Sequence, residues 1–201
     1  MKDTKDYYDK MAADWAKRGY AADAALACLD EFCKRLPQNG RVLDLCCGAG
    51  YESMRIKEKG FQVVGIDYSE ESLKIARKRN PGINFYQDNL LHNYSYIGSV
   101  DGILCIAGLV HIESRDLKQA FHSMYSVLNK DGIVLVSICE GSGKIHDRSI
   151  CMIDGEEYDR NFIAHNLEEL KDAIAGLFCY ITELESDMES WHYYLFRKIE
   201  E

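Results

Sequence analysis

The chain has 201 residues, of which 47% are hydrophobic, 28% are charged and only 2 are proline. This composition is typical of one globular domain with a sizeable core, and it excludes disordered and collagen-like chains. With 24 Lys and Arg against 33 Asp and Glu, the formal net charge is −9, which disfavours nucleic acids and anionic membranes as partners because both are negatively charged.

The first 38 residues precede the predicted core and include an aromatic helical stripe. Tyr8, Met11, Ala12 and Trp15 recur at the spacing of one helical face. One interpretation of this stripe is packing against the sheet that follows.

From residue 39 onward, apolar runs alternate with helical patterns, which is typical of a parallel sheet covered by helices. The sequence predicts strands at 41–46, 61–67, 83–87, 100–106 and 133–139, and helices at 51–59, 70–79 and 114–129. A helix at 167–174 and an antiparallel strand pair at 178–185 and 191–197 follow. Residues 140–166 show weak periodicity, so we expect a loop over the strand ends, and long loops of this kind are more often functional than idle.

Membrane and metal signals are weak in this sequence. No apolar run approaches the roughly 18 residues of a spanning helix, and the first residues lack the apolar stretch of a signal peptide. The 8 cysteines form no CxxC pair, and none of the 6 histidines has another three or four residues away. We therefore expect a cytoplasmic protein with reduced core cysteines and no metal.

The turn after the first strand carries the sharpest local signal. Asp44 is followed by Leu-Cys-Cys and by Gly48-Ala-Gly50, and glycines at such a turn let the backbone approach a ligand closely. The second strand ends in Asp67, 17 residues after Gly50, where a carboxylate can accept both hydroxyls of a ribose. The pair predicts an adenosine-containing ligand, although each acid taken alone could be a cap or turn residue.

These motifs resemble those of the class I S-adenosylmethionine-dependent methyltransferases, over about residues 40 to 197. The family's loop has the form D-x-G-x-G-x-G, which here begins at Asp44, with Cys46 in place of the first glycine. The resemblance implies a Rossmann-like, doubly wound α/β sheet of seven strands, mostly parallel with an antiparallel C-terminal hairpin. It also implies a single domain over residues 1–201, with 1–38 as a helical lid or cap and 39–201 as the core.

The resemblance also implies the cofactor S-adenosylmethionine, with S-adenosylhomocysteine as product. Asp67 matches the ribose-binding acid, Tyr68 the side chain that packs on the adenine, and Asp88 the acid that meets the adenine amino group. A net acidic pocket suits the cationic sulfonium. The candidate cofactor-binding residues, all near the carboxyl ends of predicted strands, are Asp44, Cys46, Gly48, Gly50, Asp67, Tyr68, Asp88, Asn89 and Cys105.

Methyl transfer is an in-line displacement, so alignment and exclusion of water are the protein's main tasks. His111, just beyond the fourth strand, is a candidate general base, and the alternative is a histidine that only bonds backbone. In the resembling family the motifs Asn-Pro-Pro-Tyr and Asp-Pro-Pro-Tyr mark methylation of planar amino nitrogens; both are absent from this sequence, so the resemblance disfavours that subclass. Candidate substrate contacts are Tyr8, Trp15, His146, Arg148, Tyr158 and Arg160, alongside the alternative that they are ordinary surface or packing residues.

The predicted function is methyl transfer to O, N or S of a small molecule by a monomer or homodimer. One alternative is an NAD(P)-dependent oxidoreductase, although Ser53 stands at the third glycine position of the dinucleotide motif. The other is a non-catalytic protein that binds S-adenosylmethionine.

Overall fold

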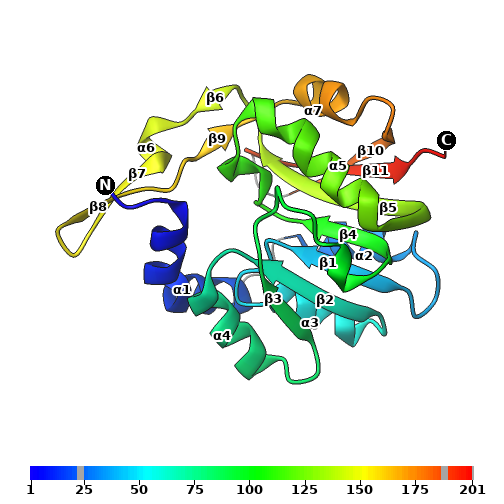
Figure 1. The fold of residues 1–201 in the computed structure, drawn as a ribbon, viewed down its shortest axis with the longest axis horizontal. Coiled ribbons are helices and arrows are strands. Elements are labelled where there is room, and N and C mark those ends of the chain that lie inside the picture. Colours follow the sequence, from blue (N-terminus) through cyan, green and yellow to red (C-terminus); the bar gives the residue numbers. More distant parts are fainter. Residues whose placement is uncertain (22–24, 187–189, 201) are drawn as a thin grey trace.

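The computed structural model describes residues 1–21, 25–186 and 190–200, and its centre is a seven-stranded sheet (Figure 1). The strand order is β10-β11-β5-β4-β1-β2-β3. Their bounds are β1 (Arg41–Leu45), β2 (Gln62–Asp67), β3 (Asn84–Gln87), β4 (Val100–Cys105), β5 (Leu128–Cys139), β10 (Phe178–Leu184) and β11 (Trp191–Lys198). Only β11 runs antiparallel to its neighbours β5 and β10; the other pairs are parallel. The predicted fold class and C-terminal hairpin are confirmed.

Helices cover both faces of this sheet. Their bounds are α2 (Leu26–Cys33), α3 (Tyr51–Glu58), α4 (Glu70–Arg79), α5 (Leu117–Val127) and α7 (Leu167–Ile174), with single 3₁₀ turns η1 (Ser95–Ile97), η2 (Leu109–His111) and η3 (Ser114–Asp116). One core cluster joins α5 and α7 to the sheet and includes the fully buried Phe121. A second cluster joins α2 and α3, through Phe32 and Ile56, to the same strands. Each such buried apolar side chain contributes about 1.5 to 3 kcal/mol to folding.

Helix α4 shows how local sequence sets the element bounds. The Ser69 hydroxyl accepts a hydrogen bond from Ser72 N at 3.1 Å and so caps the helix. Glu70 and Glu71 lie in the first turn and three basic residues lie in the last, as the helix dipole favours. α4 follows β2 directly, and Cys47 N donates to Ile66 O at 3.0 Å, which holds the end of that strand beside the turn after β1.

Residues 140–166 are more ordered than the predicted loop. They contain β6 (Gly143–Lys144), α6 (His146–Ser149), β7 (Ile150–Ile153), β8 (Glu156–Asp159) and β9 (Ile163–Ala164). β7 and β8 form a hairpin whose two turn residues, Asp154 and Gly155, have φ of 52° and 81°. Asp-Gly with two positive φ angles is a strong hairpin signal, whereas strands this short carry little periodicity.

Helix α1 (Thr4–Ala21) lies at the edge of the molecule beside α4 and the β7–β8 hairpin (Figure 1). The Lys2 backbone bonds to β8: Lys2 N donates to Glu157 O at 3.0 Å, and Asp159 N donates to Lys2 O at 2.8 Å. As far as the structure describes the chain, no α1 residue belongs to a core cluster. Within the same residues, no helix has both the length and the apolar character to cross a membrane.

Candidate functional site

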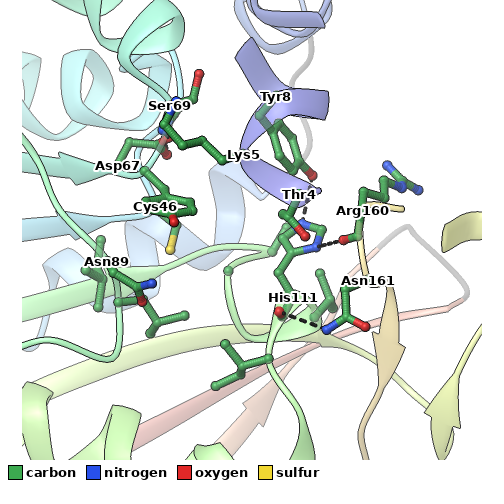
Figure 2. A pocket seen from close by; sticks show the side chains of 18 of the residues that line it. Thr4, Lys5, Tyr8, Cys46, Asp67, Ser69, Asn89, His111, Arg160 and Asn161 are labelled. Carbon is green, nitrogen blue, oxygen red and sulfur yellow. Dashed lines mark hydrogen bonds between the residues drawn. The ribbon is translucent and has the colours of Figure 1, made fainter. Parts of the chain in front are cut away.

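A cavity of about 680 Å³ opens at the carboxyl ends of β1, β2 and β4, where the strand order reverses. Parallel α/β sheets bind ligands in the crevice at this position. Figure 2 shows two groups of side chains facing each other across the cavity, with Cys46, Asp67 and Asn89 on one side and Tyr8 and His111 on the other. The chain therefore provides a nucleotide-sized space with two distinct walls.

The turn after β1 forms the floor of the cavity on the side of the first wall. Gly48 has φ of 51°, and a Cβ built on it meets nothing within 4 Å, so open cavity lies above it. Gly50 instead packs tightly, because its Cβ would come within 3.0 Å of both Asn80 and Phe85. Of the two predicted glycines, Gly48 alone lines the cavity, together with Cys46.

Asp67 joins this turn to the end of β2. Its Oδ2 accepts a hydrogen bond from Gly48 N at 2.7 Å, and its Oδ1 accepts one from Ser69 N at 2.8 Å. Burial raises the pKa of Asp67, against the opposing effect of these hydrogen bonds. Each carboxylate oxygen keeps a further lone pair, and the residue lines the cavity, so both oxygens can accept ligand hydroxyls.

Asp88 and Asn89 follow β3 on the same wall. Burial opposes ionisation of Asp88, but hydrogen bonds from Asn89 N, the Tyr96 hydroxyl and His92 outweigh it and lower its pKa. The carboxylate is therefore charged and oriented. Tyr68 also lines the cavity, and it is 44% exposed, so a ligand can reach its side chain.

Asp44 and Cys105 lie behind the wall rather than on it. Asp44 is 2% exposed, accepts a hydrogen bond from the Ser53 hydroxyl at 2.5 Å, and burial raises its pKa to about 7. A Cβ on Gly108 would come within 2.7 Å of the sulfurs of both Cys46 and Cys105, so Cys105 packs directly beneath Cys46. Through its bond with Ser53, Asp44 links strand β1 to helix α3.

His111 anchors the second wall through both ring nitrogens. Nδ1 lies 2.9 Å from the Arg160 carbonyl oxygen, which can only accept, so Nδ1 carries the proton. Nε2 then accepts from the Tyr8 hydroxyl at 2.8 Å (Figure 2). Burial lowers the pKa of His111 to about 4, with help from the Arg160 charge, and raises that of Tyr8. In this structure both side chains are therefore uncharged, and their mutual hydrogen bond occupies Nε2.

Tyr8 and His111 were each predicted as site residues, but their contact spans 103 positions and no local pattern in the sequence indicates it. Trp15 lines the cavity from α1, and its buried Nε1 has no acceptor among the described residues. Arg148 and Arg160 also line the cavity, with Asn161, Phe162 and Trp191. The other two predicted contacts lie outside it: His146 is exposed on α6, and Tyr158 is 1% exposed in β8, beneath Lys2.

Comparison with known proteins agrees with this geometry. Residues 42–132 match a family described as a methyltransferase domain. Among curated relatives, a putative methyltransferase of Bacillus subtilis, YqeM, is 37% identical over 108 residues, covering 51% of this chain and 44% of the relative. A glycine/sarcosine N-methyltransferase of Parasynechococcus marenigrum is 30% identical over 145 residues, covering 68% and 49%. The chain thus spans about half the length of these relatives.

Among solved structures, an S-adenosylmethionine-dependent methyltransferase from Clostridium acetobutylicum aligns with a TM-score of 0.72 at 17% identity. The alignment covers 95% of this chain and 98% of that one. The shared architecture therefore extends over the whole fold, including the segments on either side of the matched domain.

Proposed function

We propose that the chain is a member of the class I S-adenosylmethionine-dependent methyltransferase superfamily and that it transfers a methyl group from S-adenosylmethionine to a small-molecule acceptor. The observation that carries the proposal is the junction of Gly48 and Asp67 at the cavity floor. Gly48 leaves open space there, and the Asp67 carboxylate can accept hydrogen bonds. This combination suits a nucleoside whose ribose binds the carboxylate and whose substituent runs along the backbone.

The residues of the first wall fit the cofactor. The Asp67 oxygens would accept the two ribose hydroxyls, Asp88 would accept the adenine amino group, and Tyr68 would pack on the ring. The open space above Gly48 leaves room for the methionine portion. When bound, the cofactor supplies a methyl carbon activated by a positive sulfur, and nearby carboxylates favour that charge.

The second wall would align the acceptor and exclude water. Helix α1 brings Tyr8 and Trp15 to the cavity, and the Tyr8 bond to His111 ties this helix to the end of β4. His111 can accept a proton only after the Tyr8 hydroxyl leaves Nε2, and its lowered pKa makes it a weak base. In this proposal, alignment of the acceptor therefore contributes more to the rate of methyl transfer than base catalysis by His111 does.

Calorimetric titration with S-adenosylmethionine, S-adenosylhomocysteine and NADH tests the cofactor. We expect the first two to bind and Asp67→Ala to weaken both by more than tenfold, since hydrogen bonds to a charged group contribute about 1.5 to 3 kcal/mol. Asp172→Ala, an equal change of charge at an exposed position of α7, is the matched control. Binding of NADH alone would favour the oxidoreductase, and cofactor binding without turnover on an acceptor panel would favour a non-catalytic binding protein.

A further inference from the structure

Arg148 presents a positive charge to the cavity without an acidic partner. It is half-buried on α6 and lines the cavity. Its Nη1 lies 3.4 Å from the Cys139 sulfur, and its guanidinium carbon lies 5.4 Å from the centroid of the Phe162 ring. Within the part of the chain that the structure describes, the Arg148 side chain forms no ion pair with a carboxylate.

The other cations on the cavity wall are engaged. Lys5 pairs with Asp9 at 2.5 Å. Arg160 donates through Nε to the Arg148 carbonyl oxygen at 2.5 Å, and its guanidinium carbon lies 5.3 Å from the Tyr7 ring centroid and 4.8 Å from that of Phe162. Figure 2 shows the Arg160 side chain directed away from His111. Arg160 is thus held by its Nε bond to a carbonyl oxygen and by two rings. Among the described residues the Arg148 side chain has only the Cys139 sulfur and the Phe162 ring as partners and no oxygen acceptor, so Arg148 is the cation better placed to bind an anionic ligand.

The surroundings of Arg148 are apolar. Val110, Cys139 and Phe162 form a buried cluster, and Trp191 packs against it with its ring centroid 6.1 Å from that of Phe162. A partly desolvated cation loses hydration, and an anionic ligand would offset that loss. A ligand that complements this region therefore has an apolar body and ends in an anionic group.

We propose that the methyl acceptor is a small organic anion whose carboxylate or phosphate is bound by Arg148 and whose apolar body packs on Phe162 and Trp191. The proposal rests on the proposed function, because it describes the acceptor half of the same cavity. A guanidinium forms paired hydrogen bonds with either kind of anion. Glu113 and Asp116 also line the cavity and define the rival, an acceptor that carries a cation.

The test is calorimetric titration of the protein loaded with S-adenosylhomocysteine. The probes are benzoate, phenyl phosphate, benzamide and benzylamine, which share one apolar ring and differ in charge. At least one of the two anions should bind more tightly than benzamide, and which one does so identifies the anionic group. Arg148→Met should weaken that anion by tenfold or more and leave benzamide unchanged. Arg197→Met, the same substitution at an exposed position of β11, should change nothing.

Three results would overturn the proposal: benzylamine binding more tightly than both anions, neither anion exceeding benzamide, or an anion affinity that Arg148→Met leaves intact. Melting curves check that the variant is folded, and Arg148→Lys, which keeps the charge, should retain part of the anion affinity. Failure of S-adenosylhomocysteine to bind would refute the proposed function instead, and the same titrations on unloaded protein would still report on Arg148.

Discussion

The space above Gly48 allows a sharp test of the cofactor site, by comparison with a glycine elsewhere. Gly48 and Gly176 have φ of 51° and 78°, and at both a Cβ would meet nothing within 4 Å. They differ in location, because Gly48 lines the cavity while Gly176 is exposed between α7 and β10. Gly48→Ala and Gly176→Ala therefore both place an alanine at a positive φ with similar backbone strain, and only the first places a methyl group in the cavity.

The expected magnitudes separate the two effects. A left-handed conformation costs a non-glycine residue roughly 1 to 2 kcal/mol, partly offset by about 0.4 to 1 kcal/mol from the less flexible unfolded chain. Both variants should thus lose about 1 kcal/mol of stability, which lowers the melting temperature of a domain this size by about 2 to 4 °C. Overlap of the new methyl group with a bound ligand costs about 1 to 3 kcal/mol more, so Gly48→Ala should bind the cofactor roughly 5 to 150 times more weakly.

Melting curves and calorimetric titration with S-adenosylhomocysteine, both on the two variants and the parent, measure these quantities together. Cofactor affinity preserved in folded Gly48→Ala would refute the placement of the ligand over this turn. An equal loss of affinity in Gly176→Ala would show that backbone strain, rather than occupied space, is responsible.

Three further outcomes are expected. Deletion of residues 1–18 should lower turnover more than stability, because α1 reaches the cavity but not the core clusters; a large fall in melting temperature without cofactor, with cofactor affinity preserved, would show instead that α1 is part of the core. His111 has a pKa of about 4 against a reference of 6.5, so between these pH values the unfolded chain binds a proton that the folded chain does not. The free energy of unfolding therefore falls as the pH falls through this range, by at most about 3 kcal/mol. Urea titrations at several pH values should show that His111→Gln lacks this part of the pH dependence, and an unchanged pH dependence would refute the buried neutral histidine. At a net charge of −9, the protein should not be retained by duplex DNA at physiological salt, and salt-sensitive retention would reveal a local basic patch.

The fold was predictable because its signals are local and regular. Each of its signals lies within a few residues: Val and Ile mark the buried strands, glycines end helices, and Ser69 caps a helix. The strands and the hairpin at 178–198 can therefore be predicted from short windows of sequence. The loop expected at 140–166 was wrong in detail, because strands of two to four residues carry too little periodicity. Asp154-Gly155 was the one usable signal there.

The site was predictable only in part, for a different reason. Turn residues such as Gly48 and Asp67 sit at the ends of predicted strands, and parallel neighbours place those ends together. The hydrogen bond from Tyr8 to His111 and the contact of Arg160 with the Tyr7 ring each span more than a hundred positions, which no spacing rule encodes. Burial of Asp44 behind the wall likewise depends on the packing of α3.

The attachment of Lys2 to β8 has a practical consequence for handling this protein. The backbone of Lys2 pairs with Tyr158 of the β7–β8 hairpin, and Asp3, Thr4 and Lys5 next to it line the cavity, so an affinity tag fused ahead of Met1 would act on a segment of the cavity wall. The C-terminal end of β11 lies on the opposite side of the molecule (Figure 1). A tag placed after residue 201 would therefore leave titrations of the cavity undisturbed, and the two tagged versions, compared side by side, would report how far the first few residues govern ligand entry.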